Sequence, residues 1–265
     1  MGQLQAVLAV VSGGAVGFTL GLIGGGGSIL ATPLLLYVVG LGPHEAIGTG
    51  ALAVSASAFS NFGVHARRRN VYWQVAVLFA MVGAVGAAIG SSLGKSFDGK
   101  RLIFLFAILM IVVGVLVLRR GQAAPPAGGR GTERPASLRS IGQVCLTALV
   151  VGCLAGFFGI GGGFLIVPGL LFSTGMPMIY AVGSSLLAVG SLGLTTAVNY
   201  ATSGLVDWPI AAEYIAGGIA GGVLGTMLAV KLATRKAALN RIFAVLIFVV
   251  AGYMLYRNAA AMGFG

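Results

Sequence analysis

Long apolar segments, separated by short polar stretches, follow one another along almost the whole chain. Most of them approach or exceed the length of a helix that crosses a bilayer, which takes about 20 apolar residues. Two are short for a span and suit half-helices or re-entrant pieces. The predicted segments are 5–23, 28–41, 46–64, 71–93 and 102–118, and then 141–159, 164–174, 181–200, one that follows Asp207-Trp208-Pro209, and 237–256.

Each of the two short segments follows a cluster of glycines. Gly17–Pro33 reads GFTLGLIGGGGSILATP and Gly152–Pro168 reads GCLAGFFGIGGGFLIVP, and at an offset of 135 residues seven of the seventeen positions are identical. Glycine clusters break a helix and expose its backbone. In lipid, exposed backbone survives only where protein or a water-filled cavity surrounds it. Matching interruptions in two halves of a chain therefore indicate the substrate site of a transporter.

The same offset relates further positions, such as Trp208 to Trp73 and Gly221 to Gly86, which indicates an internal duplication. The stretch 119–140, RRGQAAPPAGGRGTERPASLRS, lies outside the duplication and contains little that could pack, so it predicts a solvent-exposed linker. The expected organisation is a first transmembrane repeat over 1–118, a cytoplasmic linker over 119–140 and a second transmembrane repeat over 141–265.

Basic residues in the loops predict how the two halves are oriented, because cytoplasmic loops carry an excess of Lys and Arg. If each half crosses the membrane an odd number of times, the loop at 67–69, the linker and the loop at 231–241 share one side. That side then holds 12 basic residues against 4 on the other, whereas parallel halves would give 9 against 7. The bias favours inverted repeats with both termini outside.

Composition places the chain in a bilayer: 58% of its residues are hydrophobic, 8% are charged and the mean hydropathy is +1.02. Soluble domains carry about a quarter charged residues. We therefore predict an all-α polytopic membrane protein of two repeats, each with four to five hydrophobic helical segments. The net charge of +11 lies in loops at helix ends and no aromatic-basic face is visible, which argues against a nucleic-acid partner.

No enzyme signature is visible. The chain has five carboxylates and two histidines, without a Ser/His/Asp arrangement, a metal-ligand cluster or a P-loop. We expect no catalytic residue, no metal and no cofactor.

A helix that begins at a glycine cluster presents free backbone N–H groups and the positive end of its dipole, which together bind an anion without a charged side chain. Ser28 and Phe164 are expected to open the short helices, with the glycines as a flexible approach. The substrate-binding residues predicted here are Gly24, Gly25, Gly26, Gly27, Ser28, Gly161, Gly162 and Gly163. The alternative is that these glycines serve only close helix packing.

Polar side chains at the ends of segments 46–64 and 181–200 extend this candidate site. Asn61, His65, Asn199 and Tyr200 could donate hydrogen bonds to a bound oxyanion, or could anchor the helices at the interface. His65 could also titrate near neutral pH. Thr49, Ser184 and Ser185 could contact substrate, or could cap helices and bond between them; these seven residues complete the predicted substrate-binding set.

Three motifs carry a resemblance to a known family. They are the duplicated Gly-x-x-x-Gly-x-x-Gly-x-Gly-Gly…Pro stretch, the Ala-x-Gly-[Thr/Ser]-x-x-Leu-Ala-Val sequence at 46–54 and 181–189, and the Val-x-Trp at 71–73 and 206–208. On these residues the chain resembles the TauE/SafE sulfite exporter family of bacterial membrane permeases. The resemblance implies seven or eight spans and a carrier of small sulfur-containing anions in the bacterial cytoplasmic (inner) membrane.

The expected function is a multi-pass secondary transporter, a permease or exporter, of a small sulfur-containing anion such as sulfite or an organosulfonate. It would work by alternating access at the interface of the two repeats. A non-transporting membrane scaffold or assembly subunit is the alternative from another class, and a permease for another small ion is a third. The expected partners are the inorganic or organic sulfur anion and the lipid bilayer, and a homo-oligomer stays open.

Overall fold

A computed structural model describes residues 3–23, 25–120, 138–161, 163–176, 178–231, 245 and 247–257. Its regular elements are all helical within these ranges, which confirms the all-α fold class. In chain order they are α1 (Gln3–Ile23), the 3₁₀ helix η1 (Gly25–Leu30), α2 (Ala31–Leu34), the π-helix η2 (Leu35–Val39), α3 (Pro43–Arg67), α4 (Trp73–Ser96), α5 (Gly99–Arg120), α6 (Leu138–Phe158), α7 (Gly163–Thr174), α8 (Met178–Ala201), α9 (Trp208–Lys231) and a helix over Ile247–Arg257.

Six helices of the described part, α1, α3, α4, α6, α8 and α9, are long and apolar enough to cross a membrane. The run 25–39, formed by η1, α2 and η2, and helix α7 are shorter, as the sequence predicted for the two segments behind the glycine clusters. The polytopic membrane architecture is therefore confirmed.

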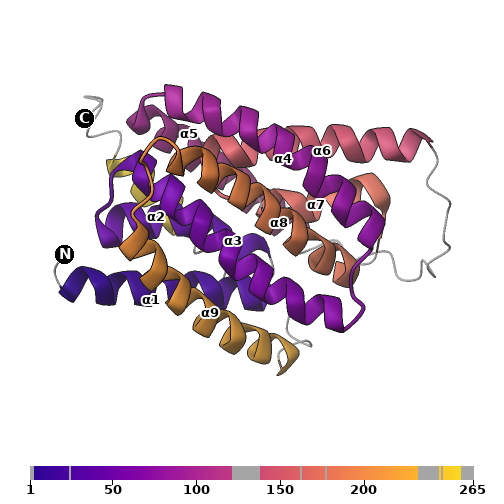
Figure 1. Cartoon of the computed structure of the whole chain (residues 1–265), viewed down its shortest axis with the longest axis horizontal. Coiled ribbons are helices and arrows are strands. Elements are labelled where there is room, and N and C mark those ends of the chain that lie inside the picture. The colour runs from indigo at the N-terminus through magenta and orange to yellow at the C-terminus, as the bar shows by residue number, and fades with distance from the viewer. Residues whose placement is uncertain are drawn as a thin grey trace.

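Helices α3 and α8 form the middle of the bundle (Figure 1). Helix α9 packs on α3 and α4 packs on α8, while α1 lies along α9 and α6 lies along α4. At the crossing of the central pair the Ser55 hydroxyl donates a 2.7 Å hydrogen bond to the Gly190 carbonyl, and both residues are buried. This bond joins two positions that lie 135 residues apart.

Glycines bring the outer helix pairs into backbone contact. A Cβ atom added at Gly17 of α1 would overlap the carbonyl of Gly218 in α9, and one at Gly152 of α6 would overlap the carbonyl of Gly83 in α4. The second pair is the first shifted by 135 residues, with the helices exchanged between the halves. Small residues allow such close approach in a membrane, where packing drives helix association. These contacts support the internal duplication, which stays a prediction.

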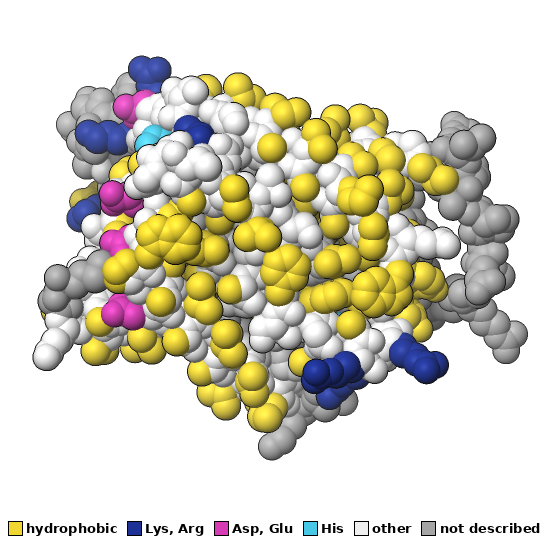
Figure 2. All heavy atoms as spheres, in the orientation of Figure 1, with side chains coloured by type: hydrophobic (Ala, Val, Ile, Leu, Met, Phe, Trp, Pro, Cys, Tyr) yellow, Lys and Arg dark blue, Asp and Glu magenta, His cyan; other side chains and the backbone are white. Residues whose placement is uncertain are grey.

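The direction of the chain defines two faces of the bundle. Gln5 near the start of α1 donates a 3.2 Å hydrogen bond to the carbonyl of Val39, so the run 25–39 returns to the end where α1 begins, which we term the terminal face. Helix α3 then crosses to the arginine face, where Arg67–Arg69 lie, and α4 returns. Figure 2 shows charged side chains gathered toward the ends of the molecule with an apolar surface between them.

Some helix ends differ from the sequence pattern. Pro43–Glu45, expected as a turn, form the first turn of α3, because the Glu45 carboxylate accepts the Gly42 N–H at 3.2 Å and caps the helix. Helix α5 continues to Arg120 and α6 begins at Leu138, so both take residues from the predicted linker 119–140. The rest of that linker lies outside the described residues.

We expect Gly86→Val to destabilise the protein, because a Cβ at Gly86 of α4 would overlap the Leu149 carbonyl of α6. Overpacking of this kind costs about 1–3 kcal/mol. The measurement is the midpoint of thermal unfolding in detergent. Gly142→Val in α6 is the matched control, since nothing lies within 4 Å of a Cβ added there. Equal midpoints for both variants would contradict this packing.

Candidate functional site

The two short segments that follow the glycine clusters meet inside the bundle. The 3₁₀ helix η1 packs against α7, and both contact α8. Their starts differ from the expected ones: α7 begins at Gly163, one residue before Phe164, and η1 begins at Gly25, before Ser28. Gly25, Gly26 and Gly27 thus belong to the 3₁₀ helix, not to a flexible approach, because the chain already turns helically at the glycines. Gly24 and Gly162 lie outside the described residues.

The second glycine cluster lies between the two central helices. Gly161 has a φ of +65°, a left-handed conformation that favours glycine. A Cβ added there would lie 3.0 Å from Cγ1 of Val54 in α3 and 3.7 Å from Cγ1 of Val189 in α8. Both valines precede the residues of the Ser55–Gly190 bond, so this cluster is at the crossing of α3 and α8. The structure therefore places a helix interruption in the centre of the bundle.

Two hydroxyl groups follow the first glycine cluster. Ser28 and Thr32 are 0% and 1% exposed and lie one helical turn apart. The Thr32 hydroxyl has no hydrogen-bond partner among the described residues, and the Thr32 backbone lies against Gly50 of α3. The sequence analysis missed Thr32, although the spacing of Ser28 and Thr32 in an apolar segment was a signal. A buried hydroxyl without a partner costs about 1–3 kcal/mol, so it is a site for a bound group.

Thr49 and Ser184 hold segments of the other half. The Thr49 hydroxyl accepts a 3.0 Å hydrogen bond from the backbone N–H of Asp207, just before α9, near the terminal face. The Ser184 hydroxyl accepts one of 3.0 Å from the backbone N–H of Tyr72, just before α4, near the arginine face. Both donor and acceptor of the second bond are shifted by 135 residues from the first. Ser185 donates instead to the Val182 carbonyl of its own helix at 2.8 Å.

Asn199 belongs to a polar network at the terminal face. The Lys95 ammonium donates to the Asn199 Oδ1 at 2.7 Å, to the Asn199 carbonyl at 2.9 Å and to the Ser203 hydroxyl at 2.9 Å. The Asn199 amide donates in turn to Ser91 at 2.6 Å and Ser92 at 2.9 Å. Lys95 thus uses its three donors, and its charge lies at the C-terminal end of α8, where the helix dipole favours a cation.

Tyr200, His65 and Asn61 lie at different depths. The Tyr200 side chain is fully buried and its hydroxyl has no partner among the described residues. The Tyr200 ring lies 6.3 Å from the His44 ring near the terminal face. His65 and Asn61 lie near the arginine face, where the His65 Nδ1 is buried without a partner and the Asn61 amide contacts Gly222.

The predicted residues therefore form three groups, not one. The glycine clusters and Ser28 lie in the centre, and the other seven residues lie toward one face or the other because α3 and α8 run in opposite directions. The buried polar side chains of the described part are hydroxyl groups of Ser and Thr, which donate to an anion without carrying charge. No group of three or more His, Cys, Asp or Glu among the described residues could hold a metal ion.

Comparison with known proteins identifies the family. The family model for the sulfite exporter TauE/SafE matches residues 9–254. The chain belongs to the TauE/SafE family. A protein of Xylella fastidiosa (strain 9a5c) named "Probable membrane transporter protein" is 53% identical over 257 residues, which cover 97% of each chain. "Probable membrane transporter protein YunE" of Bacillus subtilis (strain 168) is 28% identical over 231 residues, 81% of this chain and 85% of that one. No solved structure matches the chain.

Membership in TauE/SafE and the six apolar helices make the chain a multi-pass membrane protein of a transporter family, in a lipid bilayer. The resemblance seen in the glycine motifs is thus confirmed over nearly the whole chain. The names of the two relatives state no substrate.

We expect Asn199→Leu to destabilise the protein by about 1–2 kcal/mol, because it removes a partner of the part-buried Lys95 ammonium. The double variant Lys95→Met/Asn199→Leu should lose less than the sum of the two single variants, since contacting residues couple. Thermal unfolding midpoints of the four proteins measure this coupling. Strictly additive changes would show that the two side chains do not act together.

Proposed function

We propose that this TauE/SafE protein is a secondary transporter of a small sulfur-containing anion, such as sulfite or an organosulfonate, in the bacterial inner membrane. One observation carries the proposal: two glycine-led helical segments meet in the centre of a bundle of apolar helices. Broken helices at this depth are typical of the binding sites of secondary transporters.

The centre of the bundle offers an anion neutral hydrogen-bond donors. The first N–H groups of a helix have no partner within that helix, and they lie at the positive end of its dipole. Here such groups open α7 and the run 25–39, and the Thr32 hydroxyl adds a buried donor. A site of dipoles holds an oxyanion less tightly than a buried cation would, which suits a carrier that must release its cargo.

Alternating access follows from the arrangement of the two faces. The Thr49–Asp207 bond closes helix contacts near the terminal face, and the Ser184–Tyr72 bond does so near the arginine face. Breaking one bond while the other holds would open the centre to one side at a time. Tyr200 and His65, with their unpartnered polar atoms, lie between the centre and each face and would contact the anion on its way.

The rival functions predict different properties for the buried hydroxyl of Thr32. A scaffold whose glycines serve packing alone has no use for a buried donor without a partner, which costs stability. A permease for a metal cation would be expected to present carboxylate oxygens or soft ligands in its path. The hydroxyl groups and helix starts favour an anion.

We expect Thr32→Val to raise the KM for sulfite by about 10-fold or more, as for loss of a hydrogen bond to a charged group. Stability should hold or increase, because the hydroxyl has no partner to lose. The measurement is flux of labelled sulfite in proteoliposomes, competed with sulfate, a short organosulfonate and acetate. Thr196→Val is the matched control, since the Thr196 hydroxyl is buried but bonds to the Leu192 carbonyl at 3.0 Å.

Equal kinetics for Thr32→Val and the wild type would remove Thr32 from the site. Absence of flux for every sulfur anion, in protein shown to be folded, would reject the substrate class and then favour other small anions or the scaffold.

A further inference from the structure

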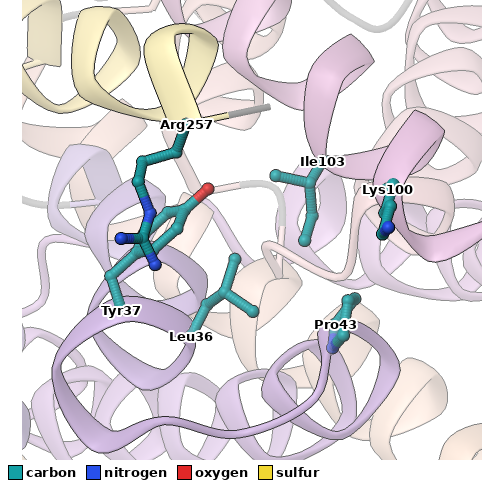
Figure 3. Close-up of a pocket in the computed structure, with 6 residues that line it drawn as sticks. All are labelled: Leu36, Tyr37, Pro43, Lys100, Ile103 and Arg257. Atoms are coloured by element: carbon teal, nitrogen blue, oxygen red, sulfur yellow. The ribbon is translucent and has the colours of Figure 1, made fainter. Parts of the chain in front are cut away.

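A cleft of about 220 Å³ opens at the terminal face, away from the central glycines. It is formed by η2, the start of α3, the start of α5 and the helix over Ile247–Arg257. Figure 3 shows Arg257 and Lys100 on opposite sides of this cleft, with apolar side chains between them. The lining residues are Leu36, Tyr37, Pro43, Lys100, Ile103 and Arg257.

Aromatic rings hold the Arg257 side chain in the cleft. Its Cζ lies 5.9 Å from the centre of the Tyr37 ring and 6.0 Å from the centre of the Tyr253 ring. The two rings contact each other edge to face at 5.3 Å. Cation–π contacts fix the plane of a guanidinium but leave its N–H groups available as donors. Arg257 is therefore positioned without being neutralised.

Neither cation of the cleft forms a salt bridge among the described residues. Two carboxylates lie close in the chain, and both are bound to helix starts. Glu45 accepts the Gly42 N–H, and Asp98 accepts the N–H groups of Lys100 and Arg101 at 2.9 and 3.1 Å. These bonds, with that from Arg101 the stronger influence, hold the pKa of Asp98 below its ordinary value. The side chains of Lys100 and Arg257 thus face the cleft as unpaired cations.

The cleft suits a compact anion. Its volume is below the roughly 300–1,000 Å³ of sites for drug-sized ligands. Arg is the residue of choice for planar, two-point recognition of an oxyanion, and Lys adds a point charge. Leu36 and Tyr37 belong to η2, the end of the same short run that begins at the first glycine cluster. The cleft and the centre of the bundle therefore share one segment.

We propose that the Lys100–Arg257 cleft binds a compact oxyanion at the terminal face. Arg257 and Lys100 donate to its oxygens, and Tyr37 positions Arg257. The ligand chemistry fits a free sulfur oxyanion and also the phosphate of a lipid headgroup. As a capture site for the transported anion, the cleft rests on the proposed function; as an oxyanion site, it does not.

Equilibrium binding of labelled sulfate to the full chain in nanodiscs of zwitterionic lipid tests the cleft. All variants carry Thr32→Val, so that the central site contributes little. We expect Lys100→Gln/Arg257→Gln to bind sulfate at least roughly 10-fold more weakly. Arg101→Gln, the neighbouring cation that does not line the cleft, should bind normally. Equal affinity of the double variant and Arg101→Gln would overturn the proposal.

Addition of phosphatidylglycerol to the nanodiscs distinguishes the two sources of oxyanion. If the lipid phosphate occupies the cleft, it will weaken sulfate binding in protein that keeps Lys100 and Arg257 but not in the double variant. If it has no effect on either, the ligand is the free anion.

Transport without the Thr32 substitution tests the capture role. Lys100→Gln/Arg257→Gln should raise the KM for sulfite at low ionic strength with kcat unchanged, because a surface charge acts on encounter and binding. An unchanged KM with loss of sulfate binding would overturn that role. These readouts fail independently of the kinetics of Thr32→Val, which test the central site.

Discussion

The hydrocarbon core of a bilayer offers no hydrogen-bond partner to a backbone N–H or C=O group, so each must be satisfied inside the protein. Long helices meet this constraint alone, but the interruptions at the two glycine clusters do not. The structure surrounds them: Gly161 lies between α3 and α8, and η1 lies between α1, α7 and α8. The order of the bundle follows, because the central pair must be close enough to cover the breaks.

Close approach in turn depends on residues without side chains. Where α1 meets α9 and α4 meets α6, the positions at Gly17 and Gly152 bring backbones together that any Cβ would force apart. In water a small residue at an interface gives up hydrophobic burial, but lipid offers no such loss, and tight packing becomes the main attraction. The many glycines of this chain thus serve two purposes, packing between helices and interruption within them.

Polarity is arranged by depth. The buried polar side chains of the described part are hydroxyl groups, and the charges of Lys95, Lys100, Arg257 and Arg67–Arg69 lie toward the two faces. Lys95 is satisfied by carbonyl, amide and hydroxyl oxygens at the end of α8, whereas Lys100 and Arg257 border an open cleft. The same residue type therefore stabilises a helix end in one place and offers a free charge in another.

The sequence by itself determined the class of the protein, its two glycine clusters and most helix spans, because hydropathy and the 135-residue offset are local, readable patterns. It also supplied nearly all the residues of the candidate centre. Only the tertiary structure decided that Thr49 and Asn199 bond to partners far along the chain, that Thr32 has none, and that Tyr37, Lys100 and Arg257 share a cleft. A side chain's role depends on which groups lie within hydrogen-bond distance, and helices that cross in opposite directions carry neighbouring motifs to opposite faces while bringing distant ones together.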